Sequence, residues 1–129
     1  MYTPISPELN RIAREIVDAL YSVHTNLGPG LLESVYEACL SHELSKRDLA
    51  VERQVPFPVV YEEVRLDCGF RVDLLVEEAI ILELKSVEGL HPIHSAQLLT
   101  YLKLTRLRLG FLVNFNVTRI RDGIQRMVY

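Results

Sequence analysis

The chain has 129 residues, 49% of them hydrophobic, and a formal net charge of −3. This length predicts one domain spanning residues 1–129 with a substantial core, and the charge excludes a protein coated in positive charge. The sequence has no basic segment followed by an apolar run at its start and no run of about 18 apolar residues, so neither secretion nor membrane insertion is expected.

The two cysteines, Cys39 and Cys68, lie in apolar surroundings and lack the spacing of a metal site. They are predicted to be reduced thiols in the core. A cytoplasmic location is therefore expected.

Charge is unevenly distributed along the chain. From Ser86 onward six basic residues face only two acids, Glu88 and Asp122, whereas residues 1–85 hold eight basic and fifteen acidic residues. An anionic partner would therefore meet the C-terminal third, although ordinary solvated faces explain each arginine equally well. The six basic residues are Lys103, Arg106, Arg108, Arg119, Arg121 and Arg126.

Two helices are predicted in the first 46 residues. Ser6 is a favoured N-cap, Pro7 suits the first helical position, and apolar residues then recur at helical spacing to about Asn26. Gly28-Pro29-Gly30 ends this helix, and a second is expected from about Leu31 to Lys46. Its buried stripe is predicted to be Leu32, Val35, Cys39 and Leu40.

The hydrophobic period then changes to two, which indicates a three-stranded meander. Residues 51–59 contain two prolines and predict an edge strand. Residues 66–74 form the second strand, and the nearly all-apolar residues 79–84 predict a central strand buried on both sides. Polar turns are expected at residues 62–63 and 77–78. The two acids of the second turn, Glu77 and Glu78, are expected to be solvated.

A third helix is expected over about residues 93–106, followed by a buried strand over residues 110–117. The short basic tail, residues 118–129, could add a last strand or turn. The order of elements predicts an α/β fold of the α+β type, a mixed sheet packed by helices.

Three charged residues interrupt the apolar hairpin VDLLVEEAIILELKS. Glu83 and Lys85 are two apart on one strand and share a face. If the hairpin pairs around residues 77–78, Asp73 lies nearly opposite Glu83. Carboxylates this close repel each other, and a divalent cation relieves the repulsion best.

Two carboxylates, a main-chain carbonyl and waters suit Mg²⁺ or Mn²⁺ better than Zn²⁺. Lys85 beside such an ion would orient a water or stabilise charge on a reacting phosphate. The simpler alternative is a salt bridge between Lys85 and either acid at the edge of the sheet.

Polar residues on two helices could face the same place. His94, Gln97 and Tyr101 share one face of the third helix, and Leu98, Leu99 and Leu102 form another. A half-buried packing role for Tyr101 and a surface or capping role for His94 are equally good explanations. Glu33, in the first turn of the second helix, is favoured there by the helix dipole in any protein.

The segment GLLESVY, residues 30–36, resembles the signature of the GxxExxY family, small bacterial and archaeal proteins of the PD-(D/E)xK nuclease superfamily. The resemblance continues through FRVDLLVEEAIILELKSVEGLHPIHSAQLLTYL, GFLVNFNV and DGIQRMVY, and so covers nearly the whole chain. Val72 replaces the proline that gives the superfamily its name.

The resemblance implies a restriction-endonuclease-like core of helix, three-stranded meander, helix and strand, with an extra N-terminal helix. It implies that Asp73 and Glu83 are metal ligands, aided by the Leu84 carbonyl, and that Lys85 is the catalytic lysine. Glu33 would correspond to the first-helix acid of these nucleases. The QLLTY segment, with Gln97 and Tyr101, resembles the QxxxY motif of RecB-type members.

The leading hypothesis is therefore a Mg²⁺- or Mn²⁺-dependent nuclease that hydrolyses phosphodiester bonds in nucleic acid, with DNA as the favoured substrate. The alternative is a non-catalytic module for binding nucleic acid or protein that retains the fold. A single domain has little room for target recognition, so a protein partner or a homodimer could supply it.

Overall fold

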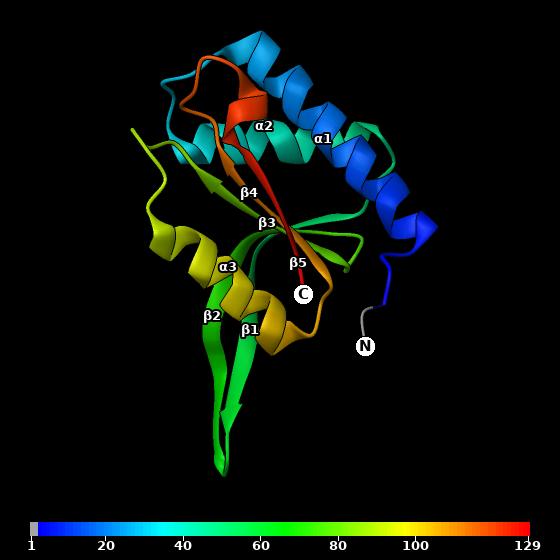
Figure 1. Ribbon diagram of the computed structural model, residues 1–129, viewed down its shortest axis with the longest axis vertical. Helices are drawn as coiled ribbons and strands as arrows, with labels where there is room; N and C mark the ends of the chain where they lie inside the picture. Colours follow the sequence, from blue (N-terminus) through cyan, green and yellow to red (C-terminus); the bar gives the residue numbers. More distant parts are fainter. Residues whose placement is uncertain (1–2) are drawn as a thin grey trace.

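The centre of the fold is a five-stranded sheet whose strands follow chain order, β1-β2-β3-β4-β5 (Figure 1). A computed structural model describes residues 3–129. β3 and β4 are parallel and every other neighbouring pair is antiparallel. The elements are α1 Pro7–Leu27, α2 Glu33–Lys46, β1 Val51–Tyr61, β2 Val64–Val76, β3 Ile80–Lys85, α3 Pro92–Thr105, β4 Leu109–Asn114, the 3-10 helix η1 Ile120–Gly123 and β5 Ile124–Val128.

This order confirms the predicted mixed sheet and its meander. α3 makes the crossover that two parallel strands require. The tail contributes both a turn, η1, and a fifth strand, β5, which lies at the opposite edge of the sheet from β1. β3 is buried along its first five residues, as predicted for a central strand.

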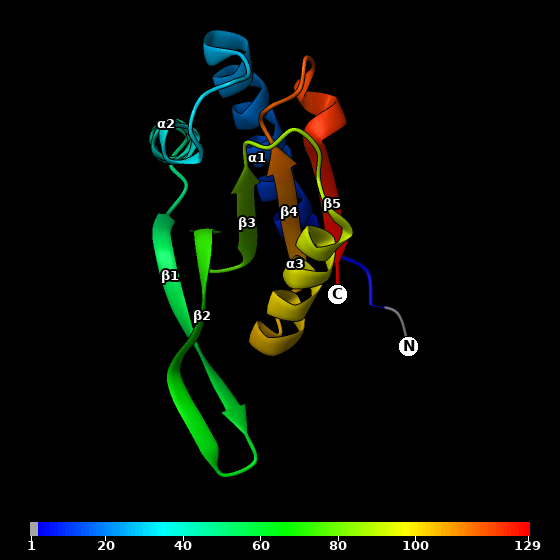
Figure 2. The ribbon, with the colours of Figure 1, turned by 90° about the vertical axis from the view of Figure 1, so that its left-hand side faces the viewer.

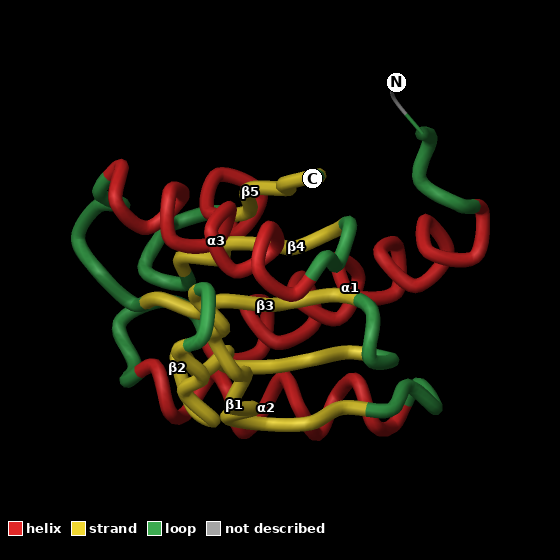
Figure 3. The backbone as a smooth tube through the Cα atoms, turned by 90° about the horizontal axis from the view of Figure 1, so that it is seen from below, coloured by secondary structure: helices red, strands yellow, loops and turns green. Residues whose placement is uncertain are grey.

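Helices cover both faces of the sheet. Residues of α1 and α2 share one core cluster with Leu82, Phe111 and other strand residues. Leu98 and Leu102 of α3 pack on the opposite face against Ile81 and Leu112. Figure 3 shows α3 on one side of the strands and α2 on the other. Side chains of β3 therefore alternate between the two helical layers, and Glu83, two residues after Ile81, lies on the α3 side.

The β1–β2 hairpin is much longer than the strands beside it. β1 pairs with β2 from Val51↔Val76 to Tyr61↔Val64, but β2 pairs with β3 only from Leu74↔Leu82 to Val76↔Ile80. The outer part of the hairpin is therefore a two-stranded ribbon that projects beyond the rest of the molecule (Figure 2). The turn at Glu62-Glu63 lies where it was predicted.

Four residues predicted for the core are not fully buried. In α2, Leu32 and Val35 are exposed and Cys39 is only partly buried; the buried residues include Tyr36 and Leu44, because the helix turns a different face to the sheet. Cys68 is exposed, because it lies on the projecting part of β2 beyond the layers that would cover it. Of the apolar face expected on α3, Leu98 and Leu102 face the sheet and Leu99 is exposed.

The two turn acids, Glu77 and Glu78, are exposed, as expected, but Glu77 also makes a contact with β1 that was not predicted. Glu77 accepts a hydrogen bond from the Ala50 N–H at 2.6 Å and donates its own N–H to the Ala50 carbonyl at 2.8 Å. Glu77 and Glu78 both have positive φ, 53° and 51°, which is the backbone of a tight two-residue hairpin. Glu77 thus joins β1 to the turn, and the turn is tight without a glycine.

Gly123 has no room for a side chain. A Cβ at this position would overlap the backbone carbonyl of Asn114, which cannot move without displacing β4. Gly123→Ala should therefore destabilise the protein by about 2 kcal/mol or more. Gly89→Ala is the matched control, because a Cβ at Gly89 meets nothing within 4 Å. Equal melting temperatures for the two variants would contradict this packing.

No helix within residues 3–129 is long and apolar enough to span a membrane.

Candidate active site

Asp73 and Glu83 come together where β2 and β3 part. The last paired residues are Leu74 and Leu82, so one step further along the same register places Asp73 opposite Glu83. Beyond this point β2 no longer accepts hydrogen bonds from β3 through its backbone, and the Asp73 side chain does so instead: its Oδ2 accepts the N–H of Leu84 at 2.8 Å. In a strand the N–H and C=O of one residue point to the same side, so the Leu84 carbonyl faces this gap too.

Glu83 is buried with an unsatisfied acceptor. It is 5% exposed, and its Oε1 has no hydrogen-bond partner within residues 3–129. Burial, followed by the negative charge of Asp73, raises the pKa of Glu83 to about 9, against a partial lowering by Lys85. An ionised Glu83 therefore needs a positive group beside it.

Lys85 does not supply a direct ion pair. None of the salt bridges between described residues includes it. It lies on the same face of β3 as Glu83, half-buried at the end of the strand. Within residues 3–129, Lys85 therefore does not form the plain salt bridge with Asp73 or Glu83 that was the simpler alternative.

Glu33 borders the same gap from the other side. It lines a pocket of about 260 Å³ together with Ser34, Glu37, Gln54, Asp73 and Leu84. Its Oε2 accepts the N–H of Ser86 at 3.4 Å, which ties the start of α2 to the residue after Lys85. Residues 33, 73 and 84, distant in sequence, thus line one pocket.

Tyr36 holds the start of α2 in this position. It is fully buried and stacks on Phe115, with ring centroids 4.3 Å apart. Its hydroxyl donates to the Gly28 carbonyl at 2.6 Å and accepts the Leu31 N–H at 3.2 Å. The tyrosine of the GLLESVY segment therefore fixes the glycine-rich turn, and so the place of Glu33.

A model of the PD-(D/E)XK nuclease superfamily matches residues 10–127. The chain belongs to the PD-(D/E)XK nuclease superfamily. Comparison with curated proteins found no match. Comparison with solved structures found none either. The match covers the five-stranded mixed sheet, and the fold agrees with that of a PD-(D/E)XK nuclease.

Nucleases of this superfamily generally use divalent metal ions, and the donors here fit such an ion. The orphaned Oε1 of Glu83 and the carboxylate of Asp73 are hard oxygen donors at one gap. No group of three or more His, Cys, Asp and Glu side chains suited to a metal is gathered within residues 3–129. The two carboxylates are therefore the acids available for direct ligation.

The nuclease fold carries a second polar network that the sequence pattern did not reveal. Glu37, only 8% exposed, binds Arg53 at 3.1 Å and the Gln54 amide at 2.6 Å. The same Gln54 nitrogen lies 3.3 Å from Oδ1 of Asp73. Gln54 has φ 51°, rare for a residue inside a strand, and this turns its side chain to the site. Glu37 therefore holds the Gln54 amide, which donates to the second oxygen of Asp73.

Glu37→Ala should lower the free energy of unfolding by about 2 kcal/mol, because the Arg53 guanidinium loses its carboxylate and the Gln54 amide loses the shorter of its two hydrogen bonds. Chemical denaturation measures this loss. Glu88→Ala, in the exposed loop before α3, is the control and should change stability by less than about 0.5 kcal/mol. A Glu37→Ala variant as stable as the control would contradict the network.

The polar face of α3 reaches the site in part. Burial, and then the charges of Glu83 and Asp73, raise the pKa of Tyr101, so its hydroxyl lies in the field of both acids. The Tyr101 ring also stacks on Phe70 at 4.4 Å. His94 instead caps its own helix, its Nδ1 accepting the His91 N–H at 3.1 Å. Gln97 is exposed.

Proposed function

We propose that this chain is a divalent-metal-dependent nuclease that hydrolyses phosphodiester bonds in DNA, using Mg²⁺ or Mn²⁺. The observation that carries the proposal is the buried Glu83 with its orphaned oxygen beside Asp73, at the point where two strands diverge. A structural network would have satisfied that oxygen with a donor. The resemblance to the GxxExxY family agrees with this proposal.

In the proposed mechanism Asp73, Glu83 and the Leu84 carbonyl would hold the ion. A bound divalent ion lowers the pKa of water and neutralises phosphate charge. Lys85, free of any ion pair among the described residues, orients the attacking water or stabilises charge developing on the phosphate. Glu33 would aid Asp73 and Glu83 through water, because no cluster of three acids is gathered among residues 3–129. Gln97 and Tyr101 position the site and the nucleic acid.

Basic residues of the C-terminal third differ in their suitability as phosphate contacts. The Arg108 guanidinium donates to the carbonyls of Tyr129 and Thr3, both at 2.6 Å, so it is already engaged. Lys103 has no ion pair within residues 3–129, and Arg119 has only a long one, 3.6 Å, to Asp122. Lys103→Ala and Arg119→Ala should each reduce the slope of log affinity against log salt by about 1. Unchanged slopes would remove them from the binding surface.

Cleavage assays test the proposal. Wild type and Lys85→Ala are incubated with single-stranded, double-stranded and branched DNA and with RNA, with Mg²⁺ or Mn²⁺ and with chelator. We expect metal-dependent products from a DNA substrate, and a loss of at least about 10³-fold in Lys85→Ala. Lys46→Ala, an exposed lysine on the far end of α2, should retain full activity.

No metal-dependent product from any substrate, or equal product from Lys85→Ala, contradicts the proposal. The alternative, a non-catalytic binding module, predicts that wild type and Lys85→Ala both bind nucleic acid and that neither cleaves it.

A further inference from the structure

The outer part of the β1–β2 hairpin, residues 58–68, is here called the arm. Its strands pair only with each other, from Val59↔Leu66 to Tyr61↔Val64. At its base Phe57 stacks on Phe70, and Phe70 stacks on Tyr101 of α3. Beyond this aromatic stack the arm stands clear of the body (Figure 2). A two-stranded ribbon without further cover is marginally stable in water.

Apolar side chains cluster at the tip of the arm. Val60, Tyr61, Val64 and Leu66 are between 55% and 70% exposed. Tyr61 pairs with Val64, and Val59 pairs with Leu66, so Tyr61, Val64 and Leu66 share one face of the ribbon and form one patch there, whereas Val60, paired with Arg65, lies on the other face. A contiguous exposed apolar patch on a projecting element indicates a contact with another macromolecule.

The charges of the arm exclude nucleic acid as that macromolecule. Its acids are Glu62, Glu63 and Asp67, and its one base, Arg65, already pairs with Asp67 at 3.2 Å. Two glutamates therefore stand unbalanced at the tip. Phosphates would repel them, whereas an apolar surface edged with arginine would attract them.

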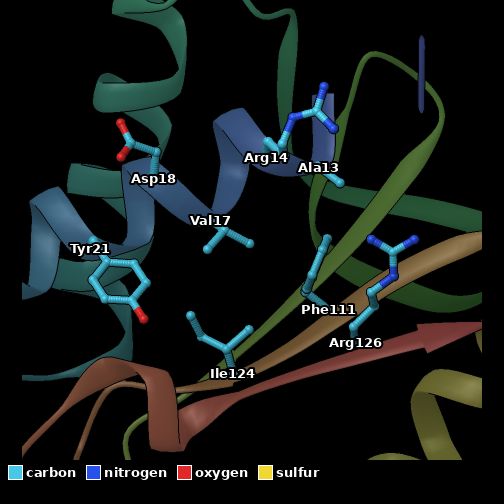
Figure 4. Close-up of a pocket in the computed structure, with 8 residues that line it drawn as sticks. All are labelled: Ala13, Arg14, Val17, Asp18, Tyr21, Phe111, Ile124 and Arg126. Carbon is cyan, nitrogen blue, oxygen red and sulfur yellow. The ribbon is translucent and has the colours of Figure 1, made fainter. Parts of the chain in front are cut away.

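The chain itself carries such a surface. A groove of about 680 Å³ lies between α1 and strands β4 and β5. Figure 4 shows Val17, Ile124 and Phe111 along its middle, with Arg14 and Arg126 at one end and Tyr21 and Asp18 at the other. The floor is apolar and the rim is charged.

The net charge of this groove is positive. Its only acid, Asp18, is bound by Arg47 at 2.7 Å. Arg14 belongs to none of the ion pairs formed within residues 3–129, and Arg126 donates to the neutral Asn10 at 3.0 Å. Two arginines without acidic partners thus border an apolar groove, as two glutamates border the apolar tip of the arm.

We propose that two copies of this chain form a dimer in which the arm of each inserts into the α1–β5 groove of the other. Tyr61, Val64 and their neighbours cover the groove floor, and Glu62 and Glu63 meet Arg14 and Arg126. The contact occurs twice, so the exchange closes a symmetric pair. This inference stands apart from the proposed nuclease activity.

A charge-exchange experiment tests the dimer. The arm variant is Glu62→Arg with Glu63→Arg, and the groove variant is Arg14→Glu with Arg126→Glu. Light scattering after size exclusion should give twice the chain mass for the wild type and one chain mass for each variant alone, with the dissociation constant raised at least about 100-fold. An equimolar mixture of the two variants should regain the dimer. In the mixed pair the basic arm of one variant meets the acidic groove of the other, and the remaining arm and groove are those of the wild type, so both contacts join opposite charges.

Two further variants separate this contact from general effects. Tyr61→Ser with Val64→Ser should give a monomer with an unchanged circular dichroism spectrum, since both side chains are exposed. Glu78→Arg with Glu88→Arg reverses two exposed acids elsewhere and should remain dimeric. A monomeric wild type, a dimeric arm variant, or a mixture that stays monomeric would each overturn the proposal.

Discussion

Glu83→Gln should raise the melting temperature of the metal-free protein at pH 7, on the order of 5 °C. Glu83 is buried beside Asp73, and a pKa of about 9 keeps it protonated in the folded chain at pH 7, whereas it ionises in the unfolded chain. The wild type loses stability through this proton uptake on folding, and the amide, which is neutral in both states, avoids the loss. Thermal denaturation in the presence of chelator measures the difference. Such a gain from removing a native side chain would show that Glu83 is kept for function at a cost in stability.

The pH dependence of this difference has a definite sign. The pKa of Glu83 is raised from 4.5 to about 9 in the folded chain. The wild type therefore loses stability as the pH rises from about 4.5 towards 9, whereas Glu83→Gln does not. The two melting curves should coincide near pH 4 and separate above it. A difference that is constant with pH would contradict the buried-charge explanation, and Asp67→Asn, an exposed carboxylate, should show no such difference.

Asp73→Ala should abolish stabilisation by Mn²⁺. An ion present at 100 times its Kd stabilises the wild type by about 2.7 kcal/mol, or roughly 8 °C for a domain of this size. The variant loses one of two carboxylates and also the acceptor of the Leu84 N–H. Melting curves with and without Mn²⁺ measure the effect, and Asp67→Ala serves as the control.

An equal Mn²⁺ response in wild type and Asp73→Ala would place the ion elsewhere. Asp73→Asn separates the two roles of the side chain, because the amide oxygen still accepts the Leu84 N–H. Asp73→Asn should melt close to the metal-free wild type and yet show little response to Mn²⁺.

The sequence predicts the central part of the site because a hairpin register is local. Once the turn at residues 77–78 is recognised, the pleat alone places Asp73 opposite Glu83 and puts Lys85 on the face of Glu83. The structure agrees, with Leu74 paired to Leu82. No long-range information is needed for these three residues.

The network around Glu37 and Gln54 could not be found in this way. It depends on a positive φ at Gln54 inside an otherwise regular strand, and on α2 turning Glu37 towards β1. Neither follows from hydrophobic periodicity. The predicted stripe of α2 failed for the same reason: the stacking of Tyr36 on Phe115, the residue that follows β4 and lies almost eighty residues away in sequence, decides which face of α2 is buried.

The length of the arm could not be predicted from the sequence pattern either. Alternation predicted both of its strands and the turn at residues 62–63, but it does not tell how far a hairpin extends past its neighbours. That length is set by where β3 begins and ends. The prediction of a buried Cys68 is wrong for this reason: the part of β2 that carries it pairs only with β1 and extends beyond the layers that would cover it.

Titration of Mn²⁺ into chelator-treated protein by isothermal calorimetry tests the central claim most directly. The account predicts saturable binding to the wild type, and a loss of at least about tenfold in affinity in both Asp73→Ala and Glu83→Gln. Lys85→Ala should bind Mn²⁺ at least as tightly as the wild type, because it removes a positive charge and no ligand. Absence of saturable binding to the wild type, or affinities unchanged by the two carboxylate substitutions, would contradict it.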